Sequence, residues 1–407
     1  MCIRDRMKIL VVCQYYYPEP FRISDICEEL VKNGNEVTVL TGIPNYPEGI
    51  IYEGYGNGDK RDEYINGVHV IRCYTIPRKK GAFYRLLNYY SYAISSSLKI
   101  LFNSVKAADG SEFDVVFVNQ LSPVMMAYAG MLYKWKHNKK LVLYCLDLWP
   151  ESLAAGGIKK NSVIYKLFDR ISGQIYKSCD QILVTSKSFI GYLSQKFAIS
   201  KNSFTYLPQY AEDLFENVAS KAEAKKTIDF VFAGNIGTLQ SVDTIIEAAE
   251  LLKDNKQLLF HIVGGGIELA SLQDEVKAKN LENVIFYGRR PVEEMPKFYS
   301  MADAMLVTLT GDPLLSLTLP GKVQSYMAAG KAIIGAIDGE TKTIVEEAQC
   351  GFICESGDFK ALAESILKFC RLCNEDRKQM EINSRNYYKN KFSKNNFVKF
   401  LEDKLKT

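Results

Sequence analysis

Short apolar runs alternate with helical patterns along most of the chain, and this alternation constrains the fold more than any other feature of the sequence. The first series of runs lies at 8–13, 36–41, 68–74, 114–118, 141–146 and 181–185, and the second at 228–232, 258–263, 284–287, 304–309, 332–335 and 351–354. Strands separated by helices are typical of parallel sheets with crossover helices. The two series therefore predict an α/β protein of two doubly wound, Rossmann-like domains.

Domain boundaries follow from the gap between the two series. A chain of 407 residues is too long for one ordinary core, since domains average about 150 residues. We expect a first domain at 7–207, a linker at 208–226, a second domain at 227–380 and a C-terminal helical segment at 381–407 that can cross back to the first domain. Pro208, several acidic residues and the polar run 219–226 mark the linker. Residues 1–6 lack the apolar core of a signal peptide, and we expect them to be a non-native leader before Met7.

Composition excludes several classes of protein. The apolar fraction of 47% and charged fraction of 24% are those of a globular protein, and no apolar run approaches the roughly 20 residues of a membrane span. A net charge of +4 is too small to indicate nucleic-acid binding. The scattered cysteines are typical of reduced cytoplasmic proteins. Two close pairs, Cys350/Cys354 and Cys370/Cys373, could bind zinc, but the first flanks a short strand and the second lies on a helical pattern. We therefore expect no metal.

One loop-helix junction in the second series has the local chemistry of an anion site. Pro320 and Gly321 mark a loop, and the apolar run 323–329 that follows reads as a short helix ended by Gly330. Lys322 falls in the first turn, where backbone N–H groups are unpaired and the helix pole is positive. These groups together suit a phosphate. An ordinary junction with a surface lysine is the alternative.

Glycine-rich turns follow two strands of the same series. Gly234-Asn235-Ile236-Gly237 comes after the first and Gly264-Gly265-Gly266 after the second. Glycine permits tight turns with or without a ligand, so neither group is informative alone. Ligands of doubly wound sheets bind at the carboxyl ends of strands, and the coincidence of both turns with the loop at 320–331 on one edge favours a diphosphate cradle.

A basic segment separates the third and fourth strands of the first series. No acidic residue occurs between Glu63 and Asp109, whereas Arg78, Lys79, Lys80 and Arg85 lie within 8 positions of one another. Apolar residues at helical spacing from Phe83 to Val105 predict one buried stripe, with further aromatic residues off it. Two interpretations stay open. The segment either contacts an anionic membrane, with about 1 kcal/mol of attraction per basic residue, or is a core helix with a solvated basic face.

Five motifs in order along the chain resemble the retaining family-4 glycosyltransferases of GT-B architecture, in the bacterial branch that includes N-acetyl-L-fucosamine transferases of O-antigen synthesis. They are 16–20 (YYPEP), 42–47 (GIPNYP), 147–152 (DLWPES), 234–237 (GNIG) and Lys322 with 326–331 (YMAAGK). The resemblance implies two Rossmann-like domains facing each other across a cleft. It also implies transfer of a sugar, with retention and without a metal or cofactor, from a nucleotide diphosphate sugar, usually UDP-linked, to an acceptor hydroxyl.

The same resemblance implies roles for individual residues. The donor diphosphate would be held by Lys322, Gly321, Asn235, Gly237 and one or both of Arg289 and Arg290, and the nucleotide would lie near Ser325, Gly264 and Gly265. Asp147 would orient the acceptor or a donor-sugar hydroxyl. The loops with Glu19, Arg22, Asn45 and Tyr46 would face the acceptor.

The chain departs from the family pattern at two places. Many relatives carry a pair of glutamates where this chain has Leu317 and Ser325, and an Arg and a Lys where it has Asn235 and Gln240. A retaining transfer can still use the leaving phosphate as base. We therefore expect a cytoplasmic glycosyltransferase, peripheral on the inner membrane face, that acts on a lipid-linked saccharide in O-antigen or capsule synthesis. A nucleotide-sugar epimerase of the same architecture and a catalytically silent partner subunit are the alternatives. The identity of the sugars stays open.

Overall fold

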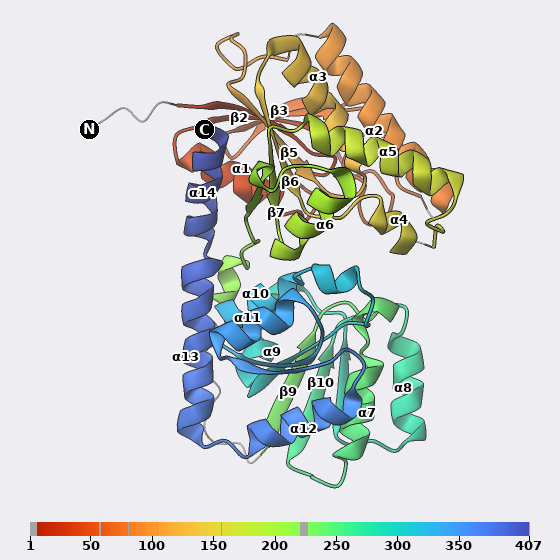
Figure 1. The fold of residues 1–407 in the computed structure, drawn as a ribbon, viewed down its shortest axis with the longest axis vertical. Helices are drawn as coiled ribbons and strands as arrows, with labels where there is room; N and C mark the ends of the chain where they lie inside the picture. Colours follow the sequence, from red (N-terminus) through yellow and green to blue (C-terminus); the bar gives the residue numbers. More distant parts are fainter. Residues whose placement is uncertain are drawn as a thin grey trace, which may run out of the picture. The chain divides into compact units, whose positions relative to one another are not determined.

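The computed structural model describes residues 6–56, 58–79, 81–103, 105–155, 157–219 and 227–406, with Ala82, Phe83 and Ala155 described by their backbone only. The chain forms two compact units. The first contains the residues up to Leu207 together with those from Val398 onward, and the second contains Pro208–Phe397. Each has a mostly parallel sheet covered by helices (Figure 1), which confirms the predicted fold class of two doubly wound α/β domains.

The sheet of the first unit has the strand order β3-β4-β2-β1-β5-β6-β7-β8. Its strands are β1 (Lys8–Val12), β2 (Glu36–Gly42), β3 (Asp62–Ile65), β4 (Val68–Cys73), β5 (Val115–Gln120), β6 (Lys140–Cys145), β7 (Gln181–Val184) and β8 (Phe204–Tyr206). The central strand β1 is parallel to both neighbours, with Val11 paired to Val39 and Phe117. Only the edge strand β3 runs antiparallel to its neighbour among the described pairs. Neither β3 nor β8 was expected, because both are short and lie at the edges of the sheet.

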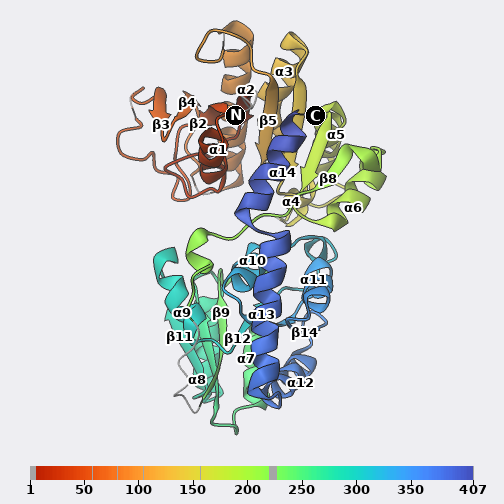
Figure 2. The ribbon, with the colours of Figure 1, turned by 90° about the vertical axis from the view of Figure 1, so that its left-hand side faces the viewer.

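Helices cover both faces of this sheet (Figure 2). They are α1 (Ile23–Lys32), α2 (Ala82–Phe102), α3 (Tyr128–His137), α4 (Glu151–Ala155), α5 (Val163–Ser178) and α6 (Lys187–Phe197), with short 3₁₀ turns η1 (Val124–Ala127) and η2 (Lys201–Ser203). Helix α5 begins where the Ser162 side chain accepts a hydrogen bond from the backbone N–H of Tyr165, which satisfies one of the unpaired N–H groups of the first turn. None of the described helices is both long and apolar enough to cross a membrane.

Helix α2 buries a different face from the one that its apolar periodicity predicts. The expected stripe is wrong for Ile94 and Leu98, which are exposed. The buried face instead carries Asn88, Tyr92 and Ser96. Their polar groups have partners: the Asn88 side chain donates to Ile76 O at 2.7 Å and accepts from Gln14 at 2.8 Å, and the Tyr92 hydroxyl donates to Leu40 O at 2.9 Å. Because these groups are hydrogen-bonded, burying them costs little, and the part of the expected stripe at Ile94, Leu98 and Leu101 is left in solvent.

The sheet of the second unit is fully parallel, in the order β11-β10-β9-β12-β13-β14. Its strands β9 (Ile228–Ala233), β10 (Leu258–Val263), β11 (Val284–Gly288), β12 (Ala304–Thr308), β13 (Ala332–Ala336) and β14 (Gly351–Cys354) coincide with the six runs of the second series. The helices are α7 (Asp243–Leu251), α8 (Leu269–Ala278), α9 (Met295–Met301), α10 (Gly321–Ala328), α11 (Glu340–Ala348), α12 (Phe359–Cys370) and α13 (Asn374–Lys391). Apolar side chains form a separate buried core on each face of the sheet.

The predicted linker and C-terminal segment have defined places. Within residues 208–219, Ala211, Phe215 and Val218 are buried in the core of the second unit, so this part of the linker is not a free connector; residues 220–226 lie outside the described residues. Helix α13 packs in the second unit, where the Ser384 hydroxyl donates to Lys331 O at 2.8 Å.

The last helix, α14 (Lys394–Lys406), passes from the second unit into the first. In the first unit its Glu402 carboxylate accepts a hydrogen bond from the Asn35 side chain at 2.6 Å. The Lys404 carbonyl accepts another from Lys140 Nζ at 2.7 Å. Leu401 and Leu405 are buried there, so the end of the chain completes the core of the first unit.

Candidate functional site

Each sheet has a topological switch point, at which the order of the strands along the sheet reverses. In the second unit this point lies between β9 and β12, and in the first unit between β1 and β5. Ligands of doubly wound sheets bind at the carboxyl ends of strands next to such a point. The loops that follow these strands are therefore the first places to look for a site.

The two glycine-rich turns of the second unit pack directly on each other. Ile236 N–H donates to Gly265 O at 2.9 Å. A Cβ on Gly264 would lie 1.8 Å from Gly234 O, and one on Gly266 would lie 2.0 Å from Ile236 O. The close approach of the two backbones explains these glycines without a ligand, and it also produces a side-chain-free surface at the ends of β9 and β10.

Lys322 points into this surface from the first turn of α10. Its Nζ is buried and has no hydrogen-bond partner among the described residues. It lies 3.9 Å from the centre of the Phe232 ring, and a Cβ on Gly234 would lie 2.9 Å from it. Burial lowers the pKa of Lys322 to about 7. A buried ammonium without a counter-charge is costly, so this arrangement is suited to an anion that supplies the missing partner.

The other predicted donor residues differ in their availability. The side chain of Asn235 donates to Gln240 Oε1 at 3.1 Å, and Gly237 N–H donates to the same oxygen at 3.2 Å. Arg289 is exposed and lies beside Gly265, whose added Cβ would be 3.3 Å from that of Arg289. The exposed Arg290 donates from Nε to Tyr287 O at 3.1 Å.

Gly321 and Ser325 lie one turn apart on the same helix as Lys322 but differ in exposure. Gly321 is exposed, and an added Cβ there would meet no atom within 4 Å. Ser325 is buried and donates from its hydroxyl to Gly321 O at 3.3 Å. The Ser325 hydroxyl is thus hydrogen-bonded within its own helix, and the nucleotide contact that we expected from it stays a prediction.

In the first unit, Glu19 connects the loops that follow β1 and β2. Its Oε1 accepts from the backbone N–H groups of Asn45 and Tyr46, each at 2.8 Å, and its Oε2 accepts from that of Tyr16 at 3.2 Å. Burial raises the pKa of Glu19 to about 7, although these hydrogen bonds oppose the rise. Asn45 is buried as well and accepts from Arg78 N–H at 2.8 Å. Both side chains therefore position the loops, and the acceptor contact predicted for them stays a prediction.

The neighbouring residues form an aromatic and cationic cluster. The Tyr46 ring lies 5.6 Å from that of Tyr15 and 5.1 Å from that of Phe21. The Arg78 guanidinium lies 5.5 Å from the centre of the Tyr46 ring, so the structure places this predicted membrane residue against the loop. Arg22 immediately precedes α1.

Asp147 follows β6 and belongs to a hydrogen-bonded chain of side chains. Its Oδ2 accepts from Ser122 N–H at 3.0 Å and from the Ser122 hydroxyl at 2.9 Å. The Ser122 hydroxyl in turn accepts from Trp149 Nε1 at 2.8 Å. Burial raises the pKa of Asp147, and the bonds from Ser122 oppose the rise. Oδ1 accepts no hydrogen bond within the described part of the chain, so it is the oxygen that can receive a ligand hydroxyl.

Sequence reasoning missed an apolar cavity next to this chain of hydrogen bonds. It has a volume of about 440 Å³ and lies between α2, η1 and α5, with Ser122 and Trp149 on its wall. Arg85, predicted to contact a membrane, lines it too. Its lining comes from segments far apart in the chain, so no local motif could have revealed it.

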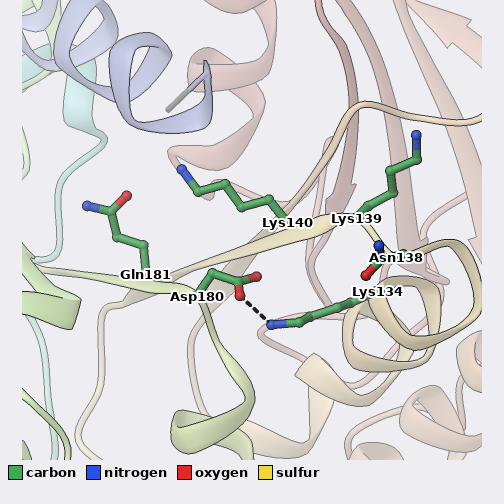
Figure 3. Close-up of a pocket in the computed structure, with 6 residues that line it drawn as sticks. All are labelled: Lys134, Asn138, Lys139, Lys140, Asp180 and Gln181. Atoms are coloured by element: carbon green, nitrogen blue, oxygen red, sulfur yellow. Dashed lines mark hydrogen bonds and ion pairs between the residues drawn. The ribbon is translucent and has the colours of Figure 1, made fainter.

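A second, polar pocket lies at the opposite ends of the strands, where β6 and β7 begin (Figure 3). Its lysines already have partners: Lys134 Nζ donates to Asp180 at 2.6 Å, Lys140 Nζ to Lys404 O at 2.7 Å, and Lys139 pairs with Glu112 at 3.5 Å. Because the carboxyl edge holds the ligand in such sheets, this pocket is not a candidate site.

The remaining predicted membrane residues are solvent-facing or undescribed. Lys79 is exposed, with Nζ 5.7 Å from the centre of the Tyr84 ring. Lys80 lies outside the described residues. The structure therefore provides exposed basic charge at Lys79, while contact with a membrane stays a prediction.

Two family models match successive parts of the chain. Residues 22–209 match the family described as Glycosyltransferase Family 4, and residues 215–387 match the one described as Glycosyl transferases group 1. The chain is 29% identical over 315 residues to the probable glycosyltransferase WbjE of Pseudomonas aeruginosa, which covers 74% of this chain and 76% of that protein. It is 26% identical over 353 residues to the putative colanic acid biosynthesis glycosyl transferase WcaI of Escherichia coli K12, covering 81% and 83%.

Solved structures share the fold at lower identity. The structure of Anabaena HepE in complex with UDP and glucose superposes with a TM-score of 0.68 at 14% identity, over 99% of this chain and 100% of that one. This likeness is one of fold alone.

Proposed function

We propose that this chain transfers a sugar with retention from a UDP-linked donor to a lipid-linked saccharide. The chain is a glycosyltransferase of GT-B fold, with a family 4 domain followed by a group 1 domain. The buried ammonium of Lys322 carries this proposal. It has no partner in the described residues and lies at the glycine surface where the chain reverses across the second sheet.

The proposed reaction explains why a cation is needed there. Breaking the anomeric bond leaves negative charge on the diphosphate, and a cation placed in advance in a dry site stabilises that charge strongly. Lys322 would face the diphosphate, together with the exposed amide end of α10 at Gly321. Arg289, beside Gly265, would add charge or border the base. With Lys322 as the cation, the step requires no metal ion.

The acceptor would bind to the first unit. Asp147 has one carboxylate oxygen that no described donor occupies, and Ser122 holds the other. That geometry suits a carboxylate that orients a sugar hydroxyl. The leaving phosphate would then act as the base, as expected for a chain with Leu317 and Ser325 in place of the paired glutamates.

The relatives support a role in bacterial surface polysaccharide, O-antigen or capsule, because WcaI is named for colanic acid biosynthesis. We propose N-acetyl-L-fucosamine as the first donor sugar to test. The chain would act at the membrane that carries the lipid-linked acceptor, with the exposed Lys79 near the anionic surface.

The test is a donor panel of UDP- and GDP-sugars incubated with lipid-linked acceptors, with the anomeric configuration of the product read by NMR. Lys322→Met should abolish transfer, whereas Lys297→Met, at an exposed lysine of α9, should not. No binding of any nucleotide diphosphate and no donor consumption would refute the proposal. An isomerised UDP-sugar formed without acceptor would indicate an epimerase instead, and nucleotide binding without turnover of any donor would indicate a silent subunit.

A further inference from the structure

The apolar cavity of the first unit has the size and lining of a ligand site. Its volume of about 440 Å³ falls in the range of roughly 300–1,000 Å³ that is usual for small-molecule pockets. Its walls include Leu86 and Tyr90 of α2, Ile164 and Leu167 of α5, and Met125 of η1. Apart from a few groups at its edge, the lining is hydrocarbon and aromatic.

Aromatic packing orders the part of the lining around Trp149. The Trp149 and Phe168 rings meet edge to face at 5.7 Å, and the Tyr90 ring lies 6.5 Å from that of Phe168. Trp149 is also held by its hydrogen bond to Ser122 at 2.8 Å. These contacts fix the positions of Trp149 and Phe168 in the lining.

The walls expose large apolar side chains to solvent. Leu86 is 41% exposed, Ile164 53% and Leu167 52%. Burying apolar surface is worth about 25 cal/mol per Å², so leaving three such side chains around one hollow is unfavourable unless something covers them. They belong to two helices, α2 and α5, that are far apart in the sequence.

Two polar groups in the lining indicate which kind of molecule would cover these exposed apolar side chains. Arg85 lines the cavity and supplies a cation. Ser122 also lines it and donates to the Asp147 carboxylate at 2.9 Å. The apolar lining matches an occupant that is hydrocarbon along most of its length, and Arg85 matches a negative head group. Ser122 places one end of this occupant near the carboxylate proposed to bind a sugar hydroxyl.

We propose that this cavity binds the hydrocarbon chain of the lipid-linked acceptor, with Arg85 facing the phosphate of its head group. The inference rests on the proposed function, because it takes the acceptor to be a lipid diphosphate saccharide. It assigns recognition of the lipid to α2 and α5 of the first unit, apart from the donor site in the second. Ser122 lines the cavity and also contacts Asp147. A hydrocarbon chain bound in the cavity would therefore lie beside the carboxylate that is proposed to orient the acceptor hydroxyl.

Geranylgeranyl diphosphate is a suitable probe, and the full chain reports on it directly. The sequence has two tryptophans, of which Trp149 lines the cavity and Trp135 is exposed on α3. In a Trp135→Phe background, binding should shift or quench Trp149 fluorescence. Ile164→Gln/Leu167→Gln should raise the Kd at least tenfold, whereas Val163→Gln, at an exposed residue of the same helix outside the cavity lining, should not change it. Arg85→Gln should weaken binding of geranylgeranyl diphosphate but not binding of geranylgeraniol.

Three results would overturn the inference. They are an unchanged Trp149 signal, equal effects of the Val163 and Ile164/Leu167 variants, and equally strong binding of dodecyl maltoside, which would show a generic apolar patch. UDP binding by each variant separates this test from that of the proposed function. If the protein binds UDP but not the lipid, the cavity assignment alone is refuted. If the parent protein does not bind UDP, the proposed donor site is refuted, while the Trp149 fluorescence still reports on lipid binding.

Discussion

Binding of UDP should be accompanied by uptake of close to one proton at pH 8, because Lys322 is mostly neutral before the ligand arrives. Burial lowers its pKa to about 7, so only about a tenth of the side chains are charged at pH 8. A diphosphate in hydrogen-bonding reach favours the charged form and should return the pKa toward its usual range. At this pH the phosphate itself, with a second pKa of about 6, contributes almost nothing.

The size and sign of this coupling follow from the same shift. Lowering the pKa from 10.5 to about 7 corresponds to roughly 5 kcal/mol that opposes charging of the empty site. UDP affinity should therefore fall by about tenfold per pH unit above 7 until the pKa of the bound state is reached. The unfolded chain binds more protons than the folded one across this range, so the ligand-free protein should gain stability as the pH rises from 7 to 10.5.

Isothermal titration calorimetry at pH 8, in buffers with different ionisation enthalpies, counts the protons taken up. Lys322→Met should abolish the uptake and weaken UDP binding, and Lys297→Met should leave both unchanged. Absence of proton uptake by the parent protein, or uptake that persists in Lys322→Met, would show that the ammonium does not meet the diphosphate.

Three further predictions test the loops and the basic surface. Glu19→Ala leaves three backbone N–H groups without their acceptor and should lower the free energy of unfolding by about 3 kcal/mol or more, measured in urea; Glu19→Gln should lose less. Since the pKa of Glu19 is raised from 4.5 to about 7, its contribution to stability should decline as the pH rises between these values, and a flat profile would contradict the burial. Gly264→Ala places a Cβ 1.8 Å from Gly234 O and should weaken UDP binding at least tenfold, whereas Gly311→Ala, with only an ordinary 3.6 Å contact, should bind normally. Lys79→Glu/Arg85→Glu should reduce the partition coefficient for phosphatidylglycerol vesicles, measured by sedimentation, about thirtyfold, from about 1 kcal/mol per basic residue lost; an equal effect of Lys253→Glu/Lys297→Glu, at two exposed lysines of the second unit, would mean that only net charge matters.

The fold was predictable because it depends on a pattern that repeats along the chain. Buried parallel strands read as continuous apolar runs, and each such run from β9 to β14 was visible in the sequence. The prediction of the buried face of helix α2 failed for a physical reason. Periodicity identifies an apolar face, but it does not say which face will be buried. Asn88 and Tyr92 found hydrogen-bond partners inside the unit, and that decided the orientation.

The candidate site was predictable to the extent that its residues are close in sequence. The motif around Lys322 indicated a cation at a helix start, and the structure places that cation at the glycine turns. Side-chain direction was not predictable from spacing, which is why the hydroxyl of Ser325 and the carboxylate of Glu19 proved to be used inside the fold. The cavity between α2 and α5 required tertiary contacts that no single stretch contains.

The placement of α14 has a consequence for synthesis on the ribosome. The first unit is translated first, yet Leu401, Glu402 and Leu405, which complete its core, are translated only after the whole second unit. At 5–20 residues per second, the intervening second unit delays them by roughly 10–40 s. During this interval the nascent first unit exposes the apolar surface that α14 will cover, and it is then a natural substrate for chaperones. Its folding can finish only after the second unit and α14 have been made, so a product that stops before α14 would leave this unit incomplete and open to degradation.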